Sequence, residues 1–322
     1  MSDNLKKNVL VVGTTQMAID YYTVLKELNC NVTIVGKSKE NADVFYAKTE
    51  VKPNVGGLEL FLSTCTDKFE YAIVAVGVEQ LANSTRLLID FGVKNILVEK
   101  PAGLSKQEIV SVSTSAKSNH ANVFVAYNRR FYASVKMAQE IIAEDGGVAS
   151  FNFEFTEWSH TIENIEKKPG VKENWLIANS SHVIDLAFYL GGKPAQIACF
   201  SSGELSWHKK SIFSGAGKTI DDKLFSYQAN WEAPGRWSVE VLTKKHRLIL
   251  RPMEDLQIQE KGSVAINKVE FNNELDVKFK PGIYTQTVSF LNGDSSQFKT
   301  LDEQIDFFDL CHQIMHGNSA IN

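Results

Sequence analysis

Short apolar runs alternate with segments of helical periodicity over the N-terminal part of the chain. The apolar runs span residues 8–12, 31–35, 71–76, 95–99 and 122–127, and the periodic segments between them include 17–28, 79–91 and 106–119. Strands that are apolar at every residue are typical of a sheet covered on both faces. Their alternation with helices indicates right-handed crossover connections. The pattern therefore predicts an α/β fold, with a doubly wound parallel sheet of the Rossmann type over residues 1–125.

The pattern changes near residue 145, where apolar and polar residues begin to alternate. Segments 149–158, 224–231 and 236–243 have a period of two, which is typical of strands with one buried face. One helix is expected over 175–190, ending at two glycines, and another over 301–317. Residues 126–322 are thus predicted to form an α+β substrate-binding and oligomerisation domain with a mostly antiparallel open sheet, in which the polar stretch 159–172 is a loop.

Composition narrows the class of protein. The 322 residues are enough for two domains, and 43% hydrophobic with 22% charged residues is ordinary for a globular protein. The formal charge of −4 gives no general attraction for nucleic acid or an anionic membrane surface. The N-terminal apolar run is too short for a signal peptide, and no run is long enough to span a membrane. The four cysteines form no CxxC pair, so we expect reduced thiols, a cytoplasmic protein and no metal site.

The first strand runs into the turn "VVGTTQMAIDYY". A dinucleotide-binding fold has G-x-G-x-x-G/A here, which lets the backbone approach a pyrophosphate at a helix N-terminus. Gly13 and Ala18 match the first and third positions, but Thr15 stands at the second. Its hydroxyl would either donate to a phosphate or, through its bulk, weaken the site.

The second strand ends in "IVGKSKEN", and the residues directly after the strand are not the acid that would hold the ribose of NAD. Gly36, Lys37 and Ser38 instead form a cationic, hydroxyl-bearing turn suited to a 2′-phosphate. NADP(H) is therefore favoured over NAD(H). The alternative is an ordinary helix start with Ser38 as its N-cap.

Two further motifs carry candidate chemistry. Lys100, in "NILVEKPAG", follows an apolar strand at the edge where open α/β sheets bind ligands, and a lysine there can donate to a substrate oxygen. The alternative is a structural turn. In "ENWLIANSSHVIDLAFYLGG", Asn179, His182 and Asp185 are spaced i, i+3, i+6 on one helix. A histidine on an apolar helix is commonly a core residue, but this one has hydrogen-bonding neighbours.

Together these motifs resemble the glucose–fructose oxidoreductase, inositol dehydrogenase and rhizopine catabolism (Gfo/Idh/MocA) family. The glycine turn, "EKPAG", "VAYNRRF" and "NSSHVIDLAFYLGG" occur in the order and at the spacing of that family. The resemblance covers essentially the whole chain. It implies NAD(P)-dependent hydride transfer on a sugar, cyclitol or nucleotide sugar.

The motifs and the resemblance give the candidate residues. Lys100 would be the catalytic lysine and His182 its acid/base partner, with Asp185 and Asn179 as further catalytic candidates. The cofactor would contact Gly13, Thr14, Thr15, Gln16, Met17, Gly36, Lys37, Ser38, Ala75, Val76, Gly77, Glu99, Lys100, Asn128 and Arg130. The substrate would contact Lys100, Trp158, Asn179, His182 and Arg236.

Three positions depart from the family pattern. Thr15 replaces the second glycine, and "AVGVEQ" at 75–80 stands where the family usually has Ala-Thr-Pro-Asn before a histidine. Ala178 occupies a position where many members have an aspartate. The missing carboxylate leaves Asn179 or Asp185 to compensate, although Asp185 could equally be structural.

The later strands carry aromatic residues that are candidates for a sugar site, because aromatic faces stack on pyranose rings. They are Trp158, His160, Trp207, Trp231 and Trp237, with Arg236 beside them, and core packing or a dimer contact is the alternative for each. A one-sided sheet with apolar strands is expected to form a homodimer or homotetramer. Two rival functions stay open: a non-catalytic binding or regulatory protein with weakened dinucleotide affinity, and a reductase of a non-sugar substrate such as a linear tetrapyrrole.

Overall fold

The computed structural model describes residues 6–317 and divides into two compact units. The first comprises the residues up to Asn128 together with Leu275–Asp306, and the second comprises Arg129–Glu274 and the residues from Phe307 onward. The expected division into two continuous segments differs from this arrangement over 275–306. That segment joins the first unit because α10 (Ile283–Asn292) contacts α1 (Gln16–Glu27), and the short strand after it pairs with the edge of the first sheet.

The first unit is built on a seven-stranded sheet in the order β15-β6-β5-β4-β1-β2-β3. Its strands are β1 (Asn8–Val12), β2 (Asn31–Gly36), β3 (Asn54–Val55), β4 (Tyr71–Val74), β5 (Asn95–Glu99), β6 (Asn122–Ala126) and β15 (Lys299–Thr300). All neighbours are parallel except β15 with β6. The middle residues of β1, β4 and β5 are fully buried, so the continuous apolar runs lie inside a covered sheet. The predicted Rossmann arrangement is confirmed.

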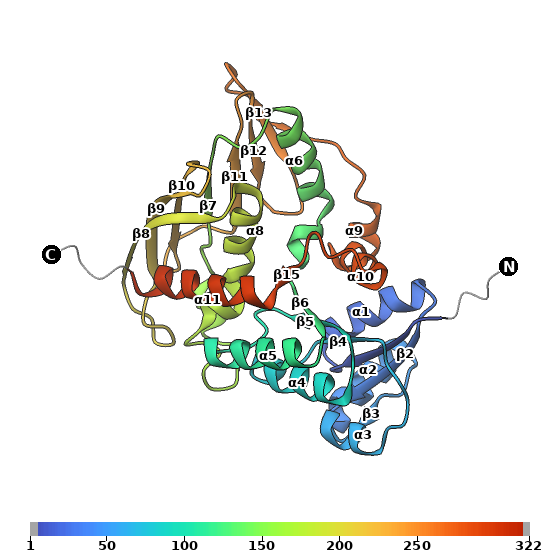
Figure 1. Cartoon of the computed structure of the whole chain (residues 1–322). Helices are drawn as coiled ribbons and strands as arrows, with labels where there is room; N and C mark the ends of the chain where they lie inside the picture. The colour runs from blue at the N-terminus through green and yellow to red at the C-terminus, as the bar shows by residue number, and fades with distance from the viewer. Residues whose placement is uncertain (1–5, 318–322) are drawn as a thin grey trace. The chain divides into compact units, whose positions relative to one another are not determined.

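Helices connect these strands (Figure 1). Besides α1 and α10 they are α2 (Lys39–Thr49), α3 (Leu58–Thr64), α4 (Leu81–Phe91), α5 (Lys106–Ser118) and α9 (Glu274–Lys278), and the 3₁₀ turn η1 (Val78–Gln80) precedes α4. α4 and α5 pack side by side. A capping box starts α5, because Ser105 accepts from the backbone of Glu108 while the Glu108 carboxylate accepts from the N-cap backbone.

The second unit holds an eight-stranded sheet in the order β14-β13-β12-β11-β7-β10-β9-β8. Its strands are β7 (Ser150–Glu154), β8 (Pro194–Ser202), β9 (Ile212–Thr219), β10 (Leu224–Asn230), β11 (Ser238–Leu242), β12 (His246–Leu250), β13 (Gln257–Glu260) and β14 (Asn267–Lys268). Only β7 and β10 pair in parallel, so the predicted, mostly antiparallel sheet is confirmed. Helix α8 (Ser181–Gly191) packs on β7 and β11, and the Phe188 ring meets Phe151 and Phe153 edge-on.

The remaining elements of this unit are the turn η2 (Asn128–Phe131), which begins at the last residue of the first unit, α6 (Ala133–Glu144), α7 (Ser159–Ile162) and a π-helical turn η3 (Leu176–Ser180). The last helix, α11 (Leu301–His316), belongs to the first unit up to Asp306 and to the second from Phe307. Segment 159–172 contains only the single turn α7 and is otherwise irregular. The single helix expected over 175–190 consists of two elements, the π-turn η3 followed directly by α8. A π-turn widens the backbone by one residue and is often found at functional sites.

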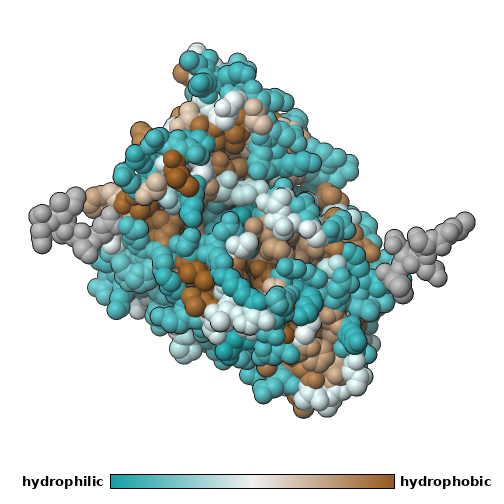
Figure 2. Space-filling view, in the orientation of Figure 1, coloured by the Kyte–Doolittle hydropathy of each residue, from teal (hydrophilic) through white to brown (hydrophobic). Residues whose placement is uncertain are grey.

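In the part of the chain that the structure describes, one face of the second sheet has no helix packed on it and carries exposed apolar side chains. Phe200 and Leu224 on this face, and Ile220 in the turn between β9 and β10, each expose about two thirds of their surface. Figure 2 shows hydrophobic residues in the region of β8 to β10, among mostly hydrophilic neighbours. A hollow of about 630 Å³ lies on this face, lined by residues of β7 to β11. Across residues 6–317, no helix combines the length and apolarity that crossing a membrane requires.

Candidate active site

Gly13 opens the turn between β1 and α1, and no other residue type fits there. Its φ is +127°, and a Cβ built on it would lie 2.2 Å from the carbonyl oxygen of Ala75. Thr15 has extended backbone (φ −83°, ψ 179°) that any residue adopts, and its exposed side chain places Oγ1 3.4 Å from the same carbonyl. Threonine at the second glycine position therefore causes no backbone strain and changes only the space at the start of α1.

The first turn of α1 is open to an anion. No side chain caps the helix and no acidic residue lies in its first turn, so its N–H groups and dipole favour a negative ligand. Thr14 is buried against Gly36, whose Cβ would lie 2.6 Å from the Thr14 methyl group. Gln16 is exposed, donates to Asp20 and accepts from Lys48, both at 2.8 Å. The glycine turn and the end of β2 thus meet at one edge of the sheet.

The residues that follow β2 and β4 lie on either side of the glycine turn at this edge of the sheet. Ser38 is the N-cap of α2 and accepts from the Asn41 backbone N–H at 3.4 Å, which is the structural role given above as the alternative to phosphate binding. Lys37 beside it is exposed. Beyond β4, Val76 is partly buried and Gly77 exposed. The Glu79 carboxylate lies only 2.6 Å from where a Cβ of Gly77 would be, so an acid stands in the loop expected to contact the cofactor.

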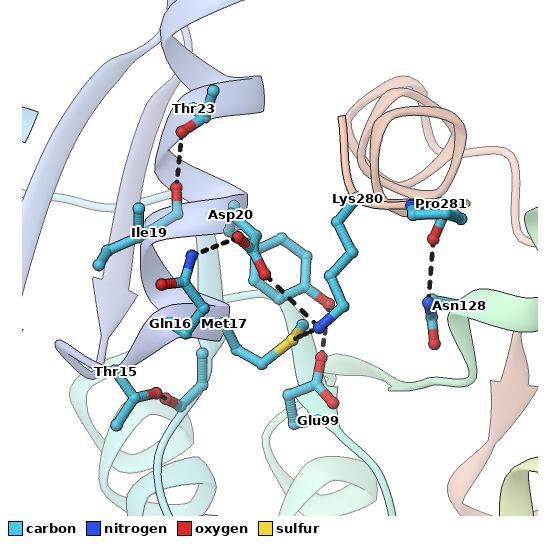
Figure 3. Close-up of polar contacts among 12 residues, drawn as sticks. Thr15, Gln16, Met17, Ile19, Asp20, Thr23, Glu99, Asn128, Lys280 and Pro281 are labelled. Carbon is cyan, nitrogen blue, oxygen red and sulfur yellow. Dashed lines mark hydrogen bonds and ion pairs between the residues drawn. The ribbon is translucent and has the colours of Figure 1, made fainter. Parts of the chain in front are cut away.

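At the end of β5, Glu99 belongs to a polar group in the first unit (Figure 3). The Tyr21 hydroxyl lies 2.8 Å from Glu99 Oε1 and 3.1 Å from Gln286 Oε1. Burial raises the pKa of Glu99, against the hydrogen bond from Tyr21 and the nearby lysines. The Lys280 ammonium reaches the same place, 3.5 Å from Asp20 and against the sulfur of Met17. A cation and a partly buried acid therefore stand together beside the start of α1.

Lys100 follows β5 directly and is partly buried. The turn after it is held in place, because the Gln304 amide donates to the carbonyl of Pro101 at 3.2 Å. Asn128, buried at the end of the first unit, donates to the carbonyl of Pro281 at 3.0 Å and so fixes the loop that carries Lys280. These bonds give the carboxyl edge of the sheet a defined shape.

In the second unit a buried carboxylate organises the π-turn. Glu157 is 2% exposed, and its Oε1 accepts from Asn179 Nδ2 at 2.9 Å and from Ser180 Oγ at 2.7 Å. Its Oε2 lies 3.4 Å from Arg236 Nη1. Burial raises the pKa of Glu157, although each of these partners lowers it. One carboxylate thus ties the segment after β7 to the turn that leads into α8.

His182 and Asp185 both lie on α8 but have different surroundings. His182 is buried, and its ring centroid lies 6.2 Å from that of Trp237. Asp185 accepts two bonds from Arg130, each of 2.7 Å, and is 1% exposed. The Arg130 guanidinium also stacks 4.6 Å from the Tyr189 ring. A bidentate ion pair of this kind favours a structural role for Asp185, and its catalytic role stays an untested prediction.

The aromatic candidates divide into two groups. Trp231 is buried and stacks on Trp207 with ring centroids 5.7 Å apart, inside the core of the unit. Trp158 is half exposed and donates to the carbonyl of the residue before Arg236. The Arg236 guanidinium lies 4.7 Å from the Trp158 ring and 4.6 Å from the Trp237 ring. The structure therefore joins Trp158 and Arg236, two of the predicted substrate residues, in one cluster.

No protein-family model matches this chain, and no curated protein matches it in sequence. Solved structures do. Levoglucosan dehydrogenase in complex with NADH superposes with a TM-score of 0.77 at 15% identity, covering 96% of both chains. UDP-N-acetylglucosamine 3-dehydrogenase GnnA from Acidithiobacillus ferrooxidans gives 0.73 at 11% identity and 97% of both chains. The super-repressor mutant of Gal80p from Saccharomyces cerevisiae gives 0.75 at 15% identity, covering 96% of this chain and 95% of that one.

The chain has the fold of these dehydrogenases. The same fold also serves Gal80p, so the likeness by itself does not choose between an enzyme and a regulator. At identities of 11–15% the comparison concerns architecture, and the assignment of residues depends on the site geometry described above.

Several residues of the site were not found by sequence analysis. Glu157 is the clearest case, and a signal for it exists: Phe151, Phe153 and Phe155 are the inward-facing residues of the alternating segment, and Glu157 continues their phase. Arg129 and Lys280 had no comparable signal. Over the described chain, no group of three or more histidine, cysteine, aspartate or glutamate side chains is placed to hold a metal ion.

Proposed function

We propose that this protein is an NAD(P)-dependent oxidoreductase that transfers a hydride between nicotinamide and a hydroxyl or carbonyl carbon of a sugar, cyclitol or nucleotide sugar. The observation that carries the proposal is the Gly13 turn, packed against the Ala75 carbonyl, beneath an uncapped helix N-terminus. This is the geometry that brings a backbone close to a pyrophosphate. Support also comes from the fold shared with a sugar dehydrogenase solved with NADH.

The bound nicotinamide would supply the hydride acceptor or donor. For the chain's own residues, we propose that Lys100 donates a hydrogen bond to the reacting oxygen and that His182 moves the hydroxyl proton. Glu99 would lie near the nicotinamide, where its partly buried carboxylate is held by Tyr21. Asn128 would act through the loop it anchors at Pro281.

NADP(H) is the cofactor we propose, because β2 is followed directly by Lys37 and Ser38 where an acid would hold the ribose of NAD. Calorimetric titration of the cofactor-free protein with NADPH and NADH tests this. We expect NADPH to bind about tenfold more tightly, and Lys37→Ala to remove the difference by weakening NADPH alone. Equal affinities in the wild type, or an equal loss for both cofactors, would contradict the assignment.

The catalytic roles are tested by turnover on a substrate found in an absorbance screen of sugars, nucleotide sugars and linear tetrapyrroles. Lys100→Met and His182→Asn should each lower kcat by roughly 10²-fold or more while NADPH still binds. Lys94→Met is the matched control, since Lys94 precedes β5 at the opposite edge and donates to Asn119. Unchanged turnover in the first two variants would remove Lys100 and His182 from the mechanism.

The second candidate function is a binding or regulatory protein without turnover. It is favoured by Glu79, whose carboxylate stands in the loop where the cofactor is expected, and by the fold shared with Gal80p. Such a protein would bind neither NADPH nor NADH, or would bind one of them and reduce no substrate in the screen. A tetrapyrrole reductase would instead be active only on the linear tetrapyrroles in the screen.

Two further proposals concern the oligomeric state of the protein and its location in the cell. The exposed apolar residues of β8 to β10 favour a homodimer or homotetramer through the uncovered face of the second sheet. Light scattering on Phe200→Lys, which places a charge on that face, should show a smaller particle than the wild type. We also propose a cytoplasmic location, because none of the four cysteines is in a disulfide.

A further inference from the structure

Three arginines and two carboxylates gather in the second unit. Arg130 is matched by Asp185 in a bidentate pair, and Arg236 shares Glu157 with two neutral donors. This leaves Arg129 as the third cation. Within ion-pair distance, the three guanidiniums therefore share only two carboxylates among the described residues.

Arg129 is the cation without an acidic partner. Among the described residues no carboxylate lies within 4.0 Å of it, and its buried Nε has no hydrogen-bond acceptor. The charges of Glu254 and Glu157 act on it only from farther away, and burial lowers the pKa of its guanidinium. A charge removed from water is normally paired. Residues 6–317 do not provide that pair, so the missing anion is expected to come from a ligand.

The surroundings hold both guanidiniums in place. Arg129 lies 4.8 Å from the Trp237 ring, and Arg236 lies 4.6 Å from the same ring and 4.7 Å from Trp158. Stacking on an aromatic face leaves the edge of a guanidinium available for bonds in its own plane. Arg236 is 43% exposed, and within the described part of the chain its one acidic contact is to Glu157 at 3.4 Å. Its side chain is thus positioned in advance and still has donors to offer.

We propose that Arg129 and Arg236, stacked against Trp237, bind an anionic group on the sugar substrate, either a carboxylate or a phosphate. The inference rests on the proposed function, and it narrows the substrate class to acidic or phosphorylated sugars. Carboxylate and phosphate share the chemistry that a planar cationic fork recognises. A neutral sugar would leave the Arg129 charge uncompensated.

Calorimetry on the cofactor-free protein, with D-glucose, D-glucuronate and D-glucose 6-phosphate as probes, tests the proposal. At least one anionic probe should bind about tenfold more tightly than glucose, and added salt should reduce that difference. Tighter binding of D-glucuronate would identify a carboxylate as the preferred anionic group, and tighter binding of D-glucose 6-phosphate would identify a phosphate. Equal affinity for all three probes, or no binding of any, would overturn the proposal.

Variants locate the effect. Arg129→Gln and Arg236→Gln should each lower the affinity for the anionic probe about tenfold, and Arg129→Lys should retain part of it because the charge is kept. Arg247→Gln is the control: Arg247 is 44% exposed, belongs to the same unit and is bound to Glu240. Wild-type affinity in both glutamine variants would refute the assignment, provided that urea unfolding shows them to be folded.

The two hypotheses fail separately. Anion selectivity is measured without cofactor, and NADPH binding is measured without sugar on the same preparations. If NADPH binds and the anionic probes bind no better than glucose, the oxidoreductase proposal stands and the anionic subsite falls. If selectivity for the anionic probe depends on Arg129 while no cofactor binds, the subsite stands and the oxidoreductase proposal falls.

Discussion

Removing the carboxylate of Glu157 is expected to destabilise the second unit strongly, and replacing it with an amide only weakly. In Glu157→Ala, the fully buried hydroxyl of Ser180 and the amide of Asn179 lose their acceptor. Each unsatisfied buried group costs about 1–3 kcal/mol. Together with the cavity left by the side chain, this gives a loss of about 4 kcal/mol in the free energy of unfolding.

In Glu157→Gln the amide oxygen still accepts from Ser180 and Asn179, while the amide nitrogen replaces the oxygen that faces Arg236. That contact is long and partly exposed, so its loss costs about 1 kcal/mol. Both variants would be measured by urea unfolding at pH 7, monitored by tryptophan fluorescence. The difference between them, about 3 kcal/mol, is the quantity under test.

Glu240→Ala is the control, because Glu240 lies on the same sheet and is bound to Arg247 at the surface. We expect it to cost no more than about 1 kcal/mol. The reasoning is refuted if alanine and glutamine at 157 cost the same, or if Glu157→Ala costs no more than the control. Either result would mean that the π-turn keeps its donors satisfied without this carboxylate.

Three further predictions concern single residues. Gly13→Ala should abolish measurable NADPH binding in calorimetry, because its Cβ would lie 2.2 Å from the carbonyl of Ala75 and φ is +127°; binding at wild-type affinity would show that the turn is not the phosphate site. Thr15→Gly should bind NADPH about fivefold more tightly, because it restores the space that the dinucleotide motif uses; a weaker complex would mean that the threonine hydroxyl binds the phosphate. Burial raises the pKa of Glu157 in the folded protein, so the folded state holds a proton that the unfolded chain has released above about pH 4.5. The free energy of unfolding contributed by this group is therefore greatest below that pH and falls as pH rises through the raised pKa, and urea midpoints of Glu157→Gln between pH 4 and 7 should lack this slope.

The strands of the first unit could be predicted closely from sequence. β1 and β5 have the predicted bounds, and β2, β4 and β6 differ by one or two residues at their C-terminal ends. The central residues of these strands are mostly buried and apolar, so the apolar run itself marks the strand. The same reasoning identified the glycine turn and Lys100, because both occur directly where a strand ends.

Tertiary structure decided what depends on contacts between distant segments. Residues 275–306 join the first unit through pairing and packing with β6 and α1, which no local pattern specifies. Glu157 becomes a site residue only because the irregular segment after β7 passes the π-turn, and its burial depends on donors more than 20 positions away. Arg129 and Arg130 are identical neighbours in sequence, and only their surroundings make one a matched ion pair and the other an unmatched cation. Sequence determined the elements because side-chain periodicity is local, whereas charge pairing in the interior is a property of the folded chain.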